Sequence, residues 1–159
     1  KLIEIDRILE ILMDLETEAK SYFNQHYNCA QSTFAPFVRK FGMDFGLAMK
    51  IATPFGGGMG HAGQVCGAVS GALMAIGLYR GISEYDREKK YACYDLAKLF
   101  QERFKELHGE LTCPGLLGLD IGDPDDLEIA HERDVFHKFC VNFVGDAVRI
   151  VADLLEIKD

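Results

Sequence analysis

The sequence contains five cysteines but no C-x-x-C pair. This absence excludes the usual zinc-finger and thioredoxin signatures, and without C-x-x-C-H it also excludes an attached c-type haem. Five widely spaced cysteines in 159 residues do not suit a disulfide scaffold either, because such scaffolds are small and dense in cysteine. Taken without further context, these thiols are typical of buried, unreactive packing residues.

The chain also lacks an excess of positive charge, and its formal net charge is −8. This balance argues against nucleic acid and against anionic membrane surfaces as partners. No signal-peptide pattern is visible, so we expect a cytoplasmic protein. One uncharged run, residues 62–79, approaches the length of a membrane span. It is rich in glycine, and we interpret it as a central core helix.

No strand pattern, internal repeat or linker is visible, so we expect a single all-α domain over residues 1–159. The predicted fold is a bundle of about six helices around a central Gly/Ala-rich helix at about 64–80. Helical periodicity predicts the other helices over 2–25, 29–41, 44–52, 84–108 and 124–156, the last of them broken near residues 131–134. Asn28, Asp44 and Asp123 are the predicted capping residues at the starts of three of these helices. Pro36 should kink or split the helix over 29–41, and residues 110–124 read as irregular.

Small residues form a row along the central helix, at Gly63, Gly67, Gly71 and Ala75. A helix face without large side chains lets another helix approach closely. The neighbour could belong to the same chain or to a second copy, and a homodimer is therefore a possible assembly.

A glycine-rich loop precedes this helix, and Gly58, Gly60 and Gly63 match the G-x-G-x-x-G fingerprint of dinucleotide sites. That fingerprint requires a preceding strand, whereas residues 50–55 read as the end of a helix. Two other uses of the glycines remain: an anion held at the helix start, or space for close packing beside a functional site.

Four of the five cysteines lie near polar breaks, glycine-rich turns or an inward helix face: Cys29, Cys66, Cys113 and Cys140. Cys93 lies in the middle of a helix and is interpreted as a packing residue. Four converging thiolates can bind zinc or an iron–sulfur cluster, whereas a pair can form a redox disulfide. Cys66 is the best candidate for a reactive thiolate, because unpaired amides at a helix start favour negative charge.

The segment from Phe55 to Met74, with Cys66-Gly67-Ala68-x-x-Gly71 at its centre, resembles the C_GCAxxG_C_C family of redox-active proteins. Asn28-Cys29-Ala30-Gln31, Thr112-Cys113-Pro114 and Cys140 with Phe143-Val144 resemble the family's other cysteine segments, in the same order. The resemblance covers about residues 22–156. The family is also similar in part to split-Soret cytochrome c, but the haem-attachment motif is absent here.

The resemblance implies a small helical redox protein, with a possible redox protein as its partner. Its four cysteines correspond to Cys29, Cys66, Cys113 and Cys140, which are then the candidate metal ligands. The first hypothesis is an iron–sulfur or other metal site for electron transfer or redox sensing. The second is a thiol–disulfide oxidoreductase that uses a pair including Cys66. The third is a helical interaction protein with packed thiols, and zinc or no cofactor are the alternatives to iron–sulfur.

The histidines and one acidic run complete the candidates. Relatives commonly carry Arg at the position of His61, and His, unlike Arg, could bind a metal or move a proton. His137 lies one turn before Cys140 and could donate a hydrogen bond to that cysteine if it binds a metal. The acidic residues from Asp120 to Glu128 lack the ligand spacing of a calcium loop and read as a loop followed by a helix N-terminus.

Overall fold

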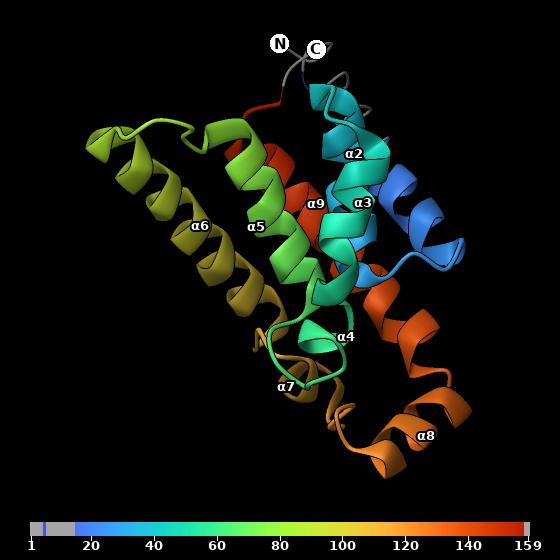
Figure 1. Ribbon diagram of the computed structural model, residues 1–159. Coiled ribbons are helices and arrows are strands. Elements are labelled where there is room, and N and C mark those ends of the chain that lie inside the picture. The colour runs from blue at the N-terminus through green and yellow to red at the C-terminus, as the bar shows by residue number, and fades with distance from the viewer. Residues whose placement is uncertain (1–4, 6–14, 158–159) are drawn as a thin grey trace.

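The computed structural model describes residues 5 and 15–157, and these residues form an all-α domain without strands (Figure 1). Of the predicted helix over 2–25, residue 5 and residues 15–24 are helical and residue 25 lies in a turn; positions 2–4 and 6–14 lie outside the described residues. The labelled α-helices are α2 (Cys29–Phe41), α3 (Phe45–Ala52), α4 (Gly56–Met59), α5 (Gly67–Arg80), α6 (Arg87–His108), α7 (Cys113–Leu117), α8 (Pro124–Glu132) and α9 (Val141–Leu154). A 3₁₀ turn, Thr53–Phe55, precedes α4, and a π-helical turn, Phe136–Cys140, leads into α9.

The centre of the fold is the packing of α5 against α2, which lie side by side in Figure 1. A Cβ added at Gly71 would lie 2.5 Å from the carbonyl oxygen of Ala30, which is far closer than atoms can pack. Glycine therefore allows the two backbones to approach. The small-residue face predicted from the sequence is thus used within the chain. The helix α2 continues through the buried Pro36 without splitting. The turns on either side of Pro36 are buried as well, and their packing stabilises the helix despite the N–H that proline lacks.

Three predictions of where helices begin or are absent were wrong. The central helix begins at Gly67 rather than near residue 64, because residues 64–66 pair with residues 111–113 instead. The next helix begins at Arg87 rather than 84, because the Asp86 side chain accepts the N–H of Lys89 and caps it. The segment 110–124 is not wholly irregular: Thr112 caps the short α7. As predicted, Asp123 caps α8, and a break follows it.

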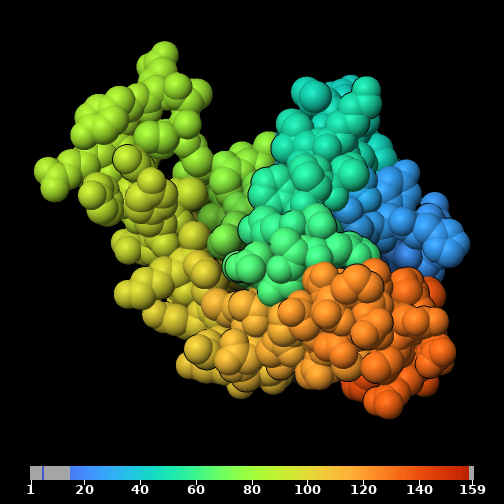
Figure 2. Space-filling model, turned by 60° about the horizontal axis from the view of Figure 1, so that its bottom comes forward, coloured from blue at the N-terminus to red at the C-terminus, as the bar shows by residue number. Residues whose placement is uncertain are grey.

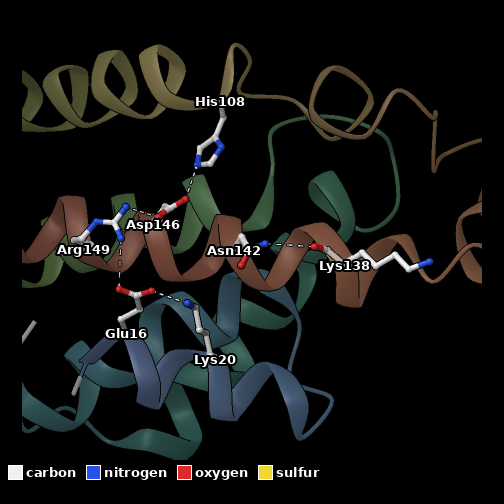
Figure 3. Close-up of polar contacts among 7 residues, drawn as sticks. All are labelled: Glu16, Lys20, His108, Lys138, Asn142, Asp146 and Arg149. Atoms are coloured by element: carbon white, nitrogen blue, oxygen red, sulfur yellow. Dashed lines mark hydrogen bonds and ion pairs between the residues drawn. The ribbon is translucent and has the colours of Figure 1, made fainter. Parts of the chain in front are cut away.

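A chain of ionic contacts joins the helix over 15–24 to α6 and α9 (Figure 3). Glu16 contacts Lys20 at 2.6 Å and Arg149 at 3.6 Å, and Arg149 also contacts Asp146. Asp146 in turn lies 3.1 Å from Nε2 of His108, the last residue of α6. Burial lowers the pKa of His108, although Asp146 opposes that shift. These contacts fix the end of α6 that leads into Cys113.

The first half of α6, residues 87–99, is named the arm. It contains no buried side chain, and Figures 1 and 2 show it projecting from the rest of the domain. Several apolar residues of this helix are exposed, including Tyr91, Leu99 and Leu107. Only Phe100 and Phe104 are buried. Among the helices described, none combines the length and the apolar character that a membrane crossing would need.

Candidate functional site

One cavity of about 190 Å³ lies at the end of the bundle where α4 and α7 are found (Figure 1). The four cysteines singled out in the sequence all contribute to its wall. The complete lining is Phe23, Asn28, Cys29, Gly57, His61, Cys66, Cys113, Leu116, Leu117, Ile121, His131, Phe136, Cys140 and Phe143. Cys93 is not among these residues and lines a separate surface hollow beside the arm. The fold therefore brings together four thiols from four separate elements and leaves out the fifth.

Cys29 is the first residue of α2, and its position depends on the polar residues around it. The side chain of Asn28 accepts the N–H of Gln31 at 2.9 Å, while the Gln31 side chain accepts the N–H of Asn28 at 3.0 Å. This reciprocal capping fixes the start of the helix. The Asn28 side chain also donates to the carbonyl oxygen of Thr53, and the Gln31 side chain donates to the Thr53 hydroxyl. The capped end of α2 is therefore bonded to the turn that precedes the glycine loop.

Cys66 and Cys113 are held together by an isolated antiparallel bridge between Val65 and Thr112. The N–H of Cys66 donates to the carbonyl of Leu111 at 2.8 Å, and the N–H of Cys113 donates to the carbonyl of Gln64 at 2.9 Å. Side chains alternate across an extended pair, so both cysteines lie on the same face of the bridge. The β-branched Val65 and Thr112 favour this extended pairing, a signal that the helical interpretation of residues 64–66 missed.

The start of α5 directs backbone N–H groups toward these sulfurs. Those of Ala68 and Val69 hydrogen-bond to Cys66, and that of Gly67 to Cys113. A hydrogen bond from the Cys113 thiol is the largest cause of a lowered pKa at Cys66, with burial opposing it and the two amides adding to it. Cys66 is therefore the thiol most ready to become a thiolate.

The pKa values of Cys113 and Cys29 are raised, so these two thiols keep their protons. The pKa of Cys113 is raised by its hydrogen bond to Cys66 and by burial. The pKa of Cys29 is raised by its hydrogen bond with Cys140, then by burial and by the other three sulfurs. The four thiols thus form two adjacent pairs around one cavity. Among the described residues, no three Cys, His, Asp or Glu side chains lie close enough to hold a single metal ion.

The glycine loop closes one side of the cavity. Gly58 has φ +70°, and a Cβ there would lie 2.8 Å from the N atom of Gln64 and 3.2 Å from the sulfur of Cys113. Glycine at this position permits both the left-handed backbone and the approach of the thiol. Gly60 and Gly63 also have positive φ, and of the glycines in this loop Gly57 lines the cavity whereas Gly58, Gly60 and Gly63 do not. A 3₁₀ turn rather than a strand precedes the loop.

Two histidines are exposed members of the lining, His61 and His131. His61 has φ +61°, and a Cβ on Gly57 would lie 2.2 Å from its ring, so the ring lies directly over the glycine loop. His131 packs edge-on against Phe136. His137 lies outside the lining and contacts Asp134 at 2.7 Å. No local pattern singled out His131, since its neighbourhood is that of an ordinary exposed helix end.

The apolar part of the lining comes from segments that meet only in the folded chain. Phe23, Leu117, Phe136 and Phe143 belong to four different elements. They surround the sulfurs with a medium of low polarity, which raises the cost of charge in the cavity and strengthens every hydrogen bond to sulfur.

Comparisons with known proteins agree with the cysteine pattern. A family described as "Putative redox-active protein (C_GCAxxG_C_C)" matches residues 27–154. An "Uncharacterized protein" of Archaeoglobus fulgidus is 28% identical over 141 residues, which are 84% of this chain and 87% of the relative. No solved structure matches the chain. Because the family match spans most of the sequence and includes all four clustered cysteines, the chain belongs to the C_GCAxxG_C_C family of redox-active proteins.

Proposed function

We propose that this protein transfers or senses electrons through an iron–sulfur cluster held by Cys29, Cys66, Cys113 and Cys140. One observation carries the proposal: the fold gathers these four thiols, and not Cys93, around a single largely apolar cavity. Four thiolates are the usual donor set of such clusters. Soft sulfur ligands without oxygen donors also favour iron–sulfur over hard cations.

The shape of the site favours a cluster over a single ion. The thiols are distributed around the cavity, and no three ligating side chains of the described residues converge on one point. A mononuclear zinc site requires such convergence. A cluster, when bound, would supply one-electron redox chemistry, and its potential depends on charge, burial and hydrogen bonds to sulfur. The chain's own contribution is the N–H groups at the start of α5, directed at Cys66 and Cys113.

The test is purification without oxygen, followed by iron and sulfide analysis and visible spectroscopy. We expect a brown protein absorbing near ~400 nm through sulfur-to-iron charge transfer. Replacing each of the four cysteines by Ser should deplete iron and sulfide, whereas Cys93→Ser is the matched control and should retain both. A colourless wild-type protein without iron and sulfide would rule out the cluster.

A second function is favoured by one specific contact, the hydrogen bond that the Cys113 thiol donates to Cys66. In this alternative the protein is a thiol–disulfide oxidoreductase, with Cys66 as attacking thiol and Cys113 as resolving thiol. Joining the two sulfurs releases two protons and transfers two electrons to an acceptor disulfide, which is reduced to two thiols.

Titration with oxidised glutathione, read by mass spectrometry, tests this alternative. A Cys66–Cys113 disulfide should form in the metal-free protein and disappear in Cys66→Ser but not in Cys93→Ser. Retention of all five free thiols at every glutathione ratio contradicts it.

A further inference from the structure

Two residues of the cavity lining are exposed to solvent, His61 and His131, and we take them to mark the mouth of the cavity. The segment Asp120–Gly122 packs directly beside the first of these: a Cβ on Gly122 would lie 3.1 Å from the carbonyl oxygen of His61, and one on Gly63 would lie 2.4 Å from the Asp120 carboxylate. His131 belongs to α8. The mouth of the thiol cavity is therefore flanked by the glycine loop on one side and by residues 120–134 on the other.

The charge of the chain is concentrated at this mouth. Residues 110–134 contain eight acidic residues and one basic residue, Arg133, which gives −7 of a total net charge of −8. The acidic residues are Glu110, Asp120, Asp123, Asp125, Asp126, Glu128, Glu132 and Asp134, and all but Asp126 are exposed. Residues 51–79, which include the glycine loop, carry no charge. Figure 2 looks onto this end, with the acidic segment in amber and orange next to the green glycine loop.

The opposite end of the molecule is different. Residues 84–99, which contain the arm, have four acidic and four basic residues and are neutral. The negative charge is thus not a uniform surface property that serves only solubility. It is concentrated on one side of the cavity, in the segment that supplies Ile121 and His131 to a largely apolar lining.

We propose that the mouth of the thiol cavity is the docking surface for a redox partner protein with a basic face. This inference rests on the proposed redox function of the four cysteines. An apolar opening flanked by charge of one sign attracts and orients a partner of the opposite sign. Charge at the rim acts mainly on the rate of association and on its salt dependence. A basic partner docked there would bring its own redox centre close to the four sulfurs that line the cavity.

The test uses cytochrome c as the basic protein probe, with the protein purified anaerobically and its iron content recorded. Calorimetric titration at low salt should give saturable binding that weakens by about tenfold or more at physiological ionic strength. The variant Asp125→Asn/Glu128→Gln/Glu132→Gln removes three charges at the mouth and should weaken binding about tenfold. These three side chains are exposed, and among the described residues none of them makes a hydrogen bond or ion pair that the substitutions would break.

A matched variant removes the same number of charges at the other end: Glu84→Gln/Glu88→Gln/Asp95→Asn. It has the same net charge as the first variant and should bind cytochrome c like the wild type, within about twofold. Equal weakening by both variants would mean that only net charge matters, and the proposal would be wrong. It is also overturned if hexaamminecobalt(III) binds in a mouth-dependent manner while cytochrome c does not, because the rim would then hold a small cation.

The same preparations separate the two proposals. Failure of the iron–sulfur assignment appears as missing iron and sulfide before any titration. Failure of the docking proposal appears as binding that ignores which end was neutralised, in protein whose iron and sulfide are normal.

Discussion

The two ends of this molecule are built in opposite ways. At the thiol end, α2, α4, α5 and α7 meet so closely that Gly58 and Gly71 leave no room for a methyl group. At the other end, the arm is a regular helix on which no side chain is buried. α5 runs from the first environment to the second. The comparison shows that the helix of the arm and the thiol site form for different reasons. Local signals, capping and periodicity, are enough to form the arm. The site forms only when backbone segments that are distant in the sequence come into close contact.

The largest effect should come from two identical substitutions in α5. Gly71→Ala places a methyl group 2.5 Å from the Ala30 carbonyl oxygen and should cost about 3 kcal/mol of unfolding free energy. Gly77→Ala meets nothing within 4 Å and should stabilise by about 0.5–1 kcal/mol, through helix propensity. Chemical denaturation of both variants measures the difference. Similar values for the two would show that α2 and α5 do not pack as described.

The next prediction concerns the glycine loop. Gly58→Ala introduces a side chain at φ +70° against Gln64 and the Cys113 sulfur, and should cost about 2 kcal/mol. We expect iron and sulfide content to fall more than the helical circular dichroism does, because the clash is confined to the cavity wall. Gly42→Ala is the control: it has a similar φ of +74° but no neighbour within 4 Å. If both variants lose metal equally, backbone strain rather than crowding at Cys113 is responsible.

A smaller effect should appear in the pH dependence of the metal-free protein. The pKa of Cys29 is raised in the folded state, so this thiol keeps its proton after the unfolded chain has lost it. Stability is therefore present below the ordinary thiol pKa of 9.0 and lost as pH rises above it, by about 1.4 kcal/mol per pH unit for one group. Cys29→Ala should flatten this slope by that amount.

Urea titrations at several pH values above 9 measure the slope, with Cys93→Ala as the matched thiol outside the cavity. A slope unchanged by Cys29→Ala would contradict a protonated Cys29 in the folded state.

The smallest effect belongs to the arm. Tyr94 is 55% exposed, and Tyr94→Ala should change the unfolding free energy by less than about 0.5 kcal/mol. Phe104→Ala, on the buried half of the same helix, should cost about 3–5 kcal/mol and serves as the reference. A large loss at Tyr94 in thermal denaturation would mean that the arm is covered in solution.

The sequence patterns predicted the individual helices more accurately than they predicted the contacts between helices. The all-α fold was confirmed, and the capping signals at Asn28, Asp44 and Asp123 predicted helix starts correctly, because these signals act within one turn. The family resemblance was likewise confirmed over residues 27–154. Individual cysteines could be singled out from their polar and glycine-rich surroundings.

The interior of the site could not be predicted in the same way. The pairing of residues 64–66 with 111–113 joins segments separated by all of α5 and α6, and neither segment has the length or alternation of a strand. The acidic rim was visible in the sequence as charge, but its place beside the cavity mouth follows from the packing of Asp120–Gly122 against His61. Both are consequences of tertiary contact. The metal-ligand roles of the cysteines stay predictions.

The bridge between Val65 and Thr112 has a consequence for how the protein is made. The chain emerges from the ribosome with Cys29 first and Cys140 last, and the bridge can close only after α5 and α6 have both been synthesised. Closing so long a loop costs conformational entropy, and this cost is offset only when the flanking helices pack. During synthesis, therefore, the early cysteines exist for a time without their partners. A cofactor held by all four thiols can therefore be inserted only after Cys140 has been synthesised, when the segments that form α2 to α8 already exist.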